Sequence, residues 1–319
     1  MSAILGALFP VFGLIALGIW LGRSQVLGKD ANEVLGRFVA VVTLPVLTFL
    51  AISGLNPGQL AQPVMGVVVI GGAWATYALH LVIERLCGER GPEGNIIALG
   101  AAYGNSGFVG LPICLALLGQ DALGPAAVIM ALNTAFVFAP GLLVQTLSAP
   151  DRHDTGDSLR AVCASLAKTP LMVACLAGIA AALVRISLPD PARVLLASIA
   201  SATAPCALVA IGMFVAKPVE RSVGAGMWRG VIGKLAISPL IAAGLLAILP
   251  PLDPIWTATA LIMAAVPAAS TVFIVAAPAG ERARRFGGAL IVWTTALSAF
   301  TIPLVLAALA VAGLAVGLP

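Results

Sequence analysis

Charged residues are scarce in this chain of 319 residues, of which 9% are Asp, Glu, Lys or Arg. Soluble domains carry about 25% charged residues. Hydrophobic residues make up 61% of the sequence, and the mean hydropathy is +1.09. This composition excludes a soluble domain and indicates a polytopic membrane protein. The net charge of +4 does not indicate nucleic-acid binding, because the basic residues stand in short joints between apolar runs.

Acidic residues are missing from the middle of every apolar run. All 13 Asp and Glu residues lie in polar joints or near the ends of the runs. Intramembrane carboxylates are the usual relay for protons and sodium ions. The chain therefore lacks the most recognisable coupling device, and coupling to a proton, to sodium or to neither ion stays open.

Clusters of cysteine and histidine are also missing. The five cysteines form no Cys-x-x-Cys pair, and His80 and His153 are isolated from each other. Cysteines scattered through apolar segments are typical of small buried hydrophobic residues. An intramembrane enzyme would need a converging nucleophile, base or metal set. We therefore expect no metal, no cofactor and no enzymatic activity.

The apolar residues form ten runs, each long enough for a helix to cross the roughly 30 Å hydrocarbon core of a bilayer. We therefore expect an all-α polytopic membrane protein with ten transmembrane helices. The expected spans are 2–22, 34–54, 62–84, 95–118, 124–147, 161–184, 192–214, 229–249, 255–279 and 287–316.

The basic residues predict the orientation. Fifteen of the 17 Lys and Arg residues lie in, or beside, joints that follow odd-numbered spans; the other two are Arg185 and Arg193. Cytoplasmic loops carry the excess of Lys and Arg. We therefore expect both termini outside and residues 148–160 in the cytoplasm. The preference for Arg over Lys is typical of a GC-rich bacterium, so we expect the inner membrane of a bacterium.

The two halves of the chain repeat. Several residues recur 160 positions later: Pro10 as Pro170, Gly18 as Gly178, Thr43 as Thr203 and Pro45 as Pro205. Because each half has an odd number of spans, the second half enters the membrane from the opposite face. Inverted repeats of this kind are a hallmark of secondary carriers. The expected organisation is a first five-helix repeat (1–147), a cytoplasmic linker (148–160) and a second, inverted repeat (161–319).

Two spans are interrupted at matching places. Residues 104–112 put three glycines and Pro112 inside the fourth span, and Pro267 interrupts the ninth. Irregular backbone at membrane depth is tolerated only where it is buried in protein or lines a cavity. Paired interruptions are the best pointer from sequence to a transporter binding site. We therefore expect the two broken helices to cross near the middle of the bilayer, with the substrate between them.

The candidate site follows from this pair. Half-helix N-termini attract anions, and polar residues at similar depth can assist them. For Asn105 the alternative role is capping of freed backbone, and Thr side chains commonly bond their own helix carbonyls. The candidate substrate-binding residues are Asn105, Ser106, Gly107, Thr48, Asn133, Ser270 and Thr271. The candidate crossover and hinge residues are Gly110, Pro112, Pro267, Pro45 and Pro205.

Lys234 is the basic residue that lies furthest inside a span. We expect its ammonium group to snorkel to the cytoplasmic interface, and a substrate or coupling charge is the alternative. An anion would then be held mainly by helix N-termini, Asn105, Ser106 and Thr271, with Lys234 secondary.

The stretch from Asn105 to Pro112 resembles the Asn-x-x-x-x-Gly-x-Pro break in the fourth span of the auxin efflux carrier family, and the whole chain is similar to its compact bacterial branch. The residues Thr43-Leu44-Pro45, Ala204-Pro205 ahead of Gly212, and the proline in the ninth span fit the same pattern. The resemblance implies a fold like that of bile-acid symporters, with a scaffold of spans one, two, six and seven.

The resemblance also implies a function. The remaining spans would form a transport domain that moves past the scaffold like an elevator and carries small carboxylates such as malonate or malate. Asn105 would match the family's crossover asparagine, Thr48 a hydroxyl position and Asn133 a polar position. Some plant members carry an Asp and a Lys in span three, where this chain has His80 and Glu84, so coupling cannot be carried over.

The sequence thus predicts a secondary active transporter of small organic anions in the lipid bilayer, which we expect to be a homodimer. A sodium-coupled symporter of the bile-acid type is one alternative, although it would need acidic and amide ligands at both breaks. The second break carries Ala268 and Ala269 instead. A passive anion channel is the other alternative, and counterflow stimulated by internal substrate would separate it from a carrier.

The orientation can be tested by cysteine labelling in intact cells. The charge bias predicts that a cysteine in Asp154→Cys reacts only with reagents that cross the inner membrane. A cysteine in Pro319→Cys should react with impermeant reagents. Labelling of the first variant from outside the cell would overturn the orientation.

Overall fold

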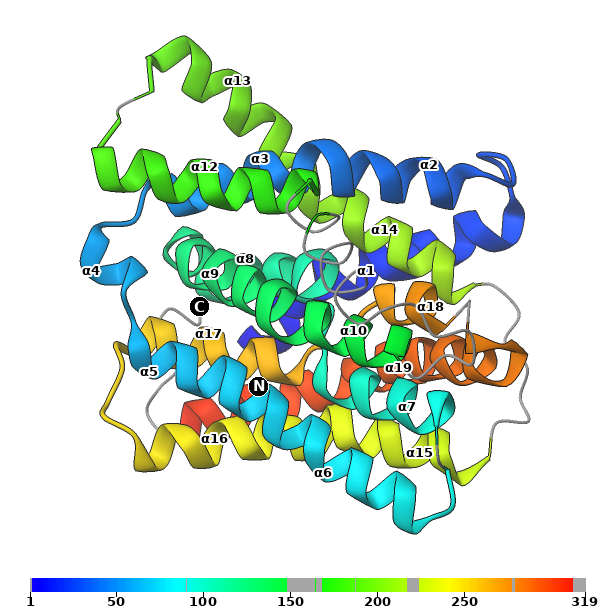
Figure 1. The fold of residues 1–319 in the computed structure, drawn as a ribbon. Helices are drawn as coiled ribbons and strands as arrows, with labels where there is room; N and C mark the ends of the chain where they lie inside the picture. Colours follow the sequence, from blue (N-terminus) through cyan, green and yellow to red (C-terminus); the bar gives the residue numbers. More distant parts are fainter. Residues whose placement is uncertain are drawn as a thin grey trace.

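The computed structural model describes residues 2–89, 91–147, 164, 168–186, 188–216, 224–276 and 279–311. Every named element within these ranges is helical, and most of the helices lie roughly along one common direction (Figure 1). The prediction of an all-α chain is confirmed for this part of the protein. The expected linker at 148–160 lies outside the described residues.

Several helices are suited to a bilayer. Six continuous helices in the described part are long and apolar enough to cross a membrane: Ala31–Ser53, Pro57–Leu86, Gln120–Gln145, Asp190–Val215, Ala225–Ile248 and Glu281–Ala308. Shorter apolar helices fall within the first, fourth, sixth and ninth expected spans: Phe9–Ser24, Ser106–Leu118, Pro170–Val184 and Pro254–Ala265. A polytopic membrane protein follows from the six long helices alone.

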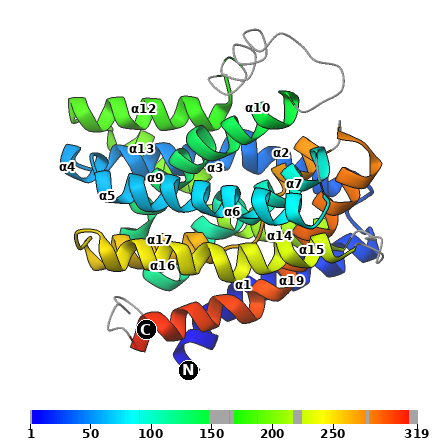
Figure 2. The ribbon, with the colours of Figure 1, turned by 60° about the horizontal axis from the view of Figure 1, so that its bottom comes forward.

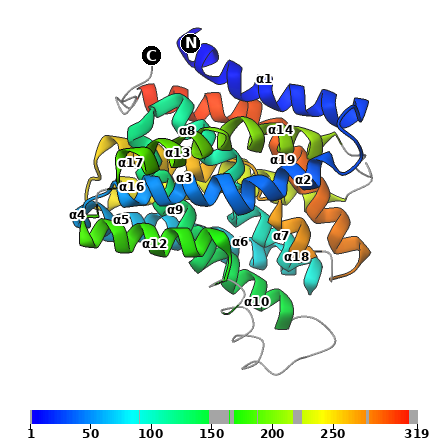
Figure 3. The ribbon, with the colours of Figure 1, turned by 90° about the horizontal axis from the view of Figure 1, so that it is seen from above.

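One group of helices packs in pairs. It comprises α1 (Ser2–Ser24), α2 (Ala31–Phe38), α3 (Leu44–Ser53), α12 (Pro170–Val184), α13 (Asp190–Ser201) and α14 (Thr203–Val215). Helix α1 lies along α14, and α12 lies along α3. In Figure 1, α12, α3 and α2 lie in the upper part of the molecule, with α13 above them. Figure 3, seen from above, shows α1 along one side and α12 along the other.

The second group surrounds the two interruptions. It comprises α5 (Pro63–Gly66), α6 (Gly72–Leu86), α7 (Pro92–Ala102), α8 (Leu111–Leu118), α9 (Leu123–Asn133), α10 (Ala139–Leu147), α15 (Ala225–Ile232), α16 (Ser238–Ile248), α17 (Pro254–Ala265), α18 (Thr271–Ala276) and α19 (Glu281–Val311). The short α4 (Pro57–Leu60) joins the first group to this one. Figure 2 shows α6 and α16 beside each other, with α19 running below them.

Prolines are accommodated by wide helical turns. Four π-helical turns are each followed by an α-helix with proline as its second residue: Val39–Thr43 before Pro45, Ser106–Gly110 before Pro112, Thr134–Phe138 before Pro140, and Gly233–Ile237 before Pro239. A proline inside an α-helix lacks the N–H and clashes with the carbonyl one turn earlier. A single wider turn relieves that clash and lets the helix continue. A fifth π-helical turn, Val67–Gly71, precedes no proline, and nothing in the structure explains it.

Glycines let the paired helices approach closely. The Cα of Gly18 on α1 faces Gly212 on α14, where an added Cβ would lie 2.9 Å from the Gly212 Cα. On α12, a Cβ at Gly178 would lie 3.0 Å from the Cβ of Ile52 on α3. Position 18 shifted forward by 160 residues is Gly178, and position 212 shifted back by 160 residues is Ile52. The two close contacts therefore involve positions related by the same offset of 160 residues.

A substitution at Gly18 tests this packing. Gly18→Leu forces a side chain into the backbone of α14, and overpacking typically costs roughly 1–3 kcal/mol. We expect a thermal unfolding midpoint in detergent lowered by about 2–4 °C per kcal/mol. Gly13→Leu, on an exposed face of the same helix where nothing lies within 4 Å, is the control. Equal midpoints for the two variants would contradict the close approach.

Candidate functional site

The two interrupted helices meet and bond to each other. Helix α7 ends at Ala102 and helical structure resumes at Ser106, while α17 ends at Ala265 and α18 begins at Thr271. The Asn105 N–H donates to the Pro267 carbonyl at 2.8 Å, and the Ala269 N–H donates to the Tyr103 carbonyl at 3.1 Å. Gly104 and Ala268 lie opposite each other as an antiparallel bridge. Each interruption thus pairs backbone groups that the other leaves free.

Asn105 is the N-cap of the helix that resumes at Ser106. Its side-chain Oδ1 accepts a hydrogen bond from the Phe108 N–H at 3.2 Å. Its Nδ2 is buried and has no hydrogen-bond partner in the described structure. A buried donor without a partner costs about 1–3 kcal/mol, so this amide is half satisfied. Capping accounts for the oxygen, and a ligand would account for the nitrogen.

Asn133 extends the polar surface. It is the last residue of α9, and its Nδ2 donates to the Ser106 Oγ at 3.4 Å. The Ser106 hydroxyl in turn lies 3.4 Å from the Gly104 carbonyl. Both bonds are long, since hydrogen bonds of this type have a usual range of about 2.7–3.2 Å. Long bonds of this kind can be exchanged for shorter ones to a bound ligand.

Lys234 is buried beside the end of α17, so the expectation that its ammonium group snorkels to the interface is wrong. Its side chain is 1% exposed. The ammonium donates to the Ala264 carbonyl at 2.7 Å and lies 3.5 Å from the Ser238 Oγ. Carbonyls at a helix C-terminus lack intrahelical partners and carry the negative end of the helix dipole. The end of α17 therefore offers the ammonium an electrostatic partner inside the protein.

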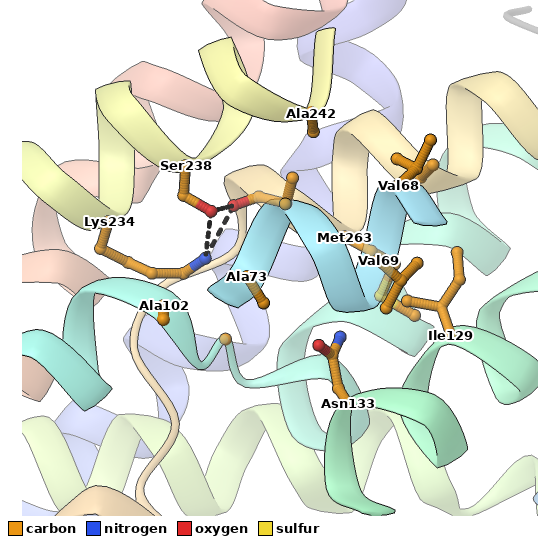
Figure 4. A pocket seen from close by; sticks show the side chains of 14 residues that line it. Val68, Val69, Ala73, Ala102, Ile129, Asn133, Lys234, Ser238, Ala242 and Met263 are labelled. Carbon is orange, nitrogen blue, oxygen red and sulfur yellow. Dashed lines mark hydrogen bonds between the residues drawn. The ribbon is translucent and has the colours of Figure 1, made fainter. Parts of the chain in front are cut away.

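A small cavity separates Lys234 from Asn133. Its volume is about 30 Å³, and a cavity larger than roughly 10–15 Å³ has room for a water molecule. Figure 4 shows Lys234 and Ser238 on one side and Asn133 on the other, with Ala73 between them. The cavity thus lies between two of the candidate polar groups, the Lys234 ammonium and the Asn133 amide.

The remaining predicted substrate residues lie at varying distances from this meeting point. Gly107 abuts α3 and α9, since an added Cβ would lie 2.9 Å from the Leu44 side chain and 3.2 Å from the Met130 sulfur. Ser270 is the last residue of the second interruption, and Thr271 is the first residue of α18. Thr48 is fully buried, and its hydroxyl donates to the Leu44 carbonyl at 2.7 Å within its own helix.

Some of the predicted hinge residues lie at the second interruption, and the others lie elsewhere in the helices. Gly110 packs against the second interruption, where an added Cβ would lie 3.4 Å from the Val266 side chain. Pro267 is part of that interruption. Pro112 is not at the first one: it stands in α8, after the π-helical turn, while the break occurs at 103–105. Pro45 is the second residue of α3, and Pro205 is an exposed residue of α14.

Sequence reasoning missed two supports of the site. Thr294 on α19 accepts the Ala268 N–H at 3.1 Å and donates to the Leu290 carbonyl at 2.7 Å. Ser238 helps to hold Lys234. A signal for the lysine was present, because a polar residue precedes a proline by five or six positions at Ser106, at Thr134 and at Lys234. That spacing places each of them in a π-helical turn, and such turns are frequent at functional sites.

A partly buried ion pair and a polar cluster lie beside these helices. Glu84 of α6 forms a bidentate pair with Arg229 of α15. Near it, the Asn95 amide joins the Tyr77 hydroxyl to the Gln145 side chain. These contacts tie α6, α7, α10 and α15 together at one end of the second group. They support the site without forming part of it.

Two comparisons with known proteins are informative. A sequence profile of the family described as "Membrane transport protein" matches residues 3–306. A protein of Rhizobium meliloti (strain 1021), named "Putative malonate transporter", is 28% identical to this chain over 304 residues. The alignment covers 95% of this chain and 94% of that protein. The range that the family profile matches includes both interruptions and Lys234.

The support from Thr294 can be measured with a pair of neighbouring substitutions. Thr294→Val leaves the buried Ala268 N–H without an acceptor, which should destabilise the protein by about 1–3 kcal/mol. Thr295 is also buried, but its hydroxyl has no partner in the described structure. Thr295→Val should therefore leave the thermal midpoint in detergent unchanged or raise it. A Thr294→Val protein as stable as wild type would contradict this role.

Proposed function

Because the chain belongs to the membrane transport protein family, which is the auxin efflux carrier family, and is therefore a transporter rather than an enzyme, we propose that it is a secondary active transporter of small organic anions. The resemblance seen in the sequence is confirmed at the level of the family. Mono- or dicarboxylates are the proposed substrate class. The similarity to a protein named for malonate, over nearly the full length of both chains, supports this choice.

The observation that carries the proposal is the free Nδ2 of Asn105 at the meeting of the two interruptions. This donor stands at the start of a helix of 13 residues, Ser106–Leu118. A helix N-terminus and an amide donor both favour a carboxylate oxygen. Helix ends contribute roughly 0.3–2 kcal/mol each and hydrogen bonds to a charged group about 1.5–3. After ordering costs are subtracted, three or four such contacts are consistent with micromolar to millimolar binding.

We extend the proposal to the architecture. The pairing of Gly18 with Gly212, and of Gly178 with Ile52, supports ten spans arranged as two inverted five-helix repeats (1–147 and 161–319). The bonded interruptions support a crossover of the fourth and ninth spans. In this arrangement α1–α3 and α12–α14 form the scaffold. The second group moves past it as an elevator and carries the substrate site with it.

The similarity to a protein named as a transporter supports a carrier over a passive anion channel. A carrier opens the site to one side at a time. We also propose a bacterial inner-membrane location, both termini outside and a homodimeric assembly. The charge bias supports the orientation.

Asn105 provides the test of the substrate site. Asn105→Ala removes a buried partner worth roughly 1–3 kcal/mol, which corresponds to a loss in substrate affinity of about 5- to 150-fold. Asn105→Asp should be worse, because it places a negative charge beside an anion. The measurement is uptake of labelled malonate, and of a panel of mono- and dicarboxylates, into proteoliposomes loaded with unlabelled substrate.

The control is Asn56→Ala. Asn56 caps the short helix α4 in an exposed joint, so its loss should leave the apparent affinity unchanged. Wild-type kinetics in a normally folded Asn105→Ala protein would remove Asn105 from the site. Uptake that internal substrate does not stimulate would favour the channel.

A further inference from the structure

We propose that the ammonium group of Lys234 takes the place of a dissociable coupling cation at the crossover, so that the protein carries its own cation and needs no sodium. This inference rests on the proposed carrier function and concerns only how that function is powered. Three features of the structure support it: the atoms that hold the ammonium, the charges around it and the space beside it.

The atoms around the ammonium are those that a monovalent cation uses at a broken helix. The Ala264 carbonyl, 2.7 Å away, belongs to the last turn of α17, and the Ser238 hydroxyl lies at 3.5 Å. The Ser238 hydroxyl also bonds to the Ala264 carbonyl at 3.4 Å. In carriers with discontinuous helices, unwound carbonyls and half-helix C-termini coordinate the coupling ion. Here these oxygen atoms already hold a cation that is part of the protein, the ammonium group of Lys234.

No acidic side chain neutralises this cation in the part of the chain that the structure describes. The carboxylates that form ion pairs there are Glu84 with Arg229, Glu89 with Arg282, Asp190 with Arg193, and Glu281 with Arg284 and Arg285. A buried charge is costly unless it is paired. The negative end of α17 provides partial compensation. A substrate carboxylate at the neighbouring N-terminus would complete it.

The lysine side chain packs closely against the first interruption. At Gly104, in the first interruption, an added Cβ would lie 3.2 Å from both Cε and Nζ of Lys234. The ammonium therefore lies between the last turn of α17, to which it is bonded, and the first interruption. The cavity of about 30 Å³ adjoins it on the side of Asn133. Removal of the lysine side chain would merge its volume with this cavity and leave room for a small cation and water.

A tethered cation has a functional consequence. An exchangeable ion links transport to its gradient, because the site must bind and release it in each cycle. A lysine moves with the protein and is never released. Anion binding then depends on a positive charge that the protein itself carries, and the sodium gradient contributes nothing. The carrier would run on the gradient of the anion and on the membrane potential.

The first measurement uses the wild-type protein. Labelled malonate uptake into proteoliposomes is compared with sodium, potassium or choline as the external cation and with no pH gradient. We expect equal rates in all three. A requirement for sodium in the wild type would overturn the inference while leaving the carrier function intact.

The second measurement is rescue of Lys234→Ala. We expect malonate counterflow to fall by at least tenfold, about 1.4 kcal/mol, and to recover when propylammonium or sodium is added to both sides. Propylammonium replaces the methylenes and the charge that the substitution removes. Lys234→Met, which fills the space without a charge, is the matched control and should be impaired to the same degree without rescue.

Three results would overturn the inference. Full activity of Lys234→Met would show that the charge is dispensable. Failure of both cations to restore a Lys234→Ala protein that unfolds at the wild-type temperature would show that the site holds no exchangeable cation. Accumulation driven by a pH gradient in the wild type, and lost in Lys234→Met, would show that the lysine exchanges its proton instead. In each case malonate counterflow by the wild-type protein reports separately on the carrier function.

Discussion

The structure depends on the need to satisfy backbone groups where no water is available. In the hydrocarbon core an unpaired N–H or carbonyl costs several kcal/mol. The two interruptions meet this need for each other, because Asn105 donates to Pro267 and Ala269 donates to Tyr103. Neither interruption would be stable alone. The broken helices are therefore coupled, and a change in one alters the hydrogen bonding of the other.

The ends of the same broken helices act as partners for charged groups, so acidic side chains are not needed there. A broken helix exposes a C-terminal end on one side and an N-terminal end on the other. Lys234 occupies the C-terminal end of α17 through the Ala264 carbonyl. The N-terminal end at Ser106 is capped only in part, by the Asn105 oxygen. A positive side chain and a vacant positive helix end thus lie on the two interruptions, which is an arrangement suited to an anion.

Sequence predicted what is local and missed what depends on packing. Glycine and proline inside an apolar run indicate a break wherever they occur, so the interruptions near Gly104 and Pro267 could be found. The fourth span is interrupted before Pro112 and not at it, because the wide turn at Ser106–Gly110 lets the helix continue through that proline. The sequence showed that Lys234 lies well inside its span. It did not show where the side chain points, because its partner Ala264 lies on another helix. The ten-span inverted repeat stays a prediction that the glycine pairs support.

Contacts between the two groups of helices bear on the proposed movement. Gly107 lies against Leu44, and Phe214 of α14 meets Phe273 of α18 edge to face with ring centroids 6.2 Å apart. Apolar contacts are non-directional, so one surface can slide over the other without breaking a fixed hydrogen-bond pattern. The interruptions are instead joined by directional backbone bonds. If the second group moves, it must therefore move as a unit, carrying Asn105 and Lys234 together, and the geometry between bound anion and ammonium is preserved on both sides of the membrane.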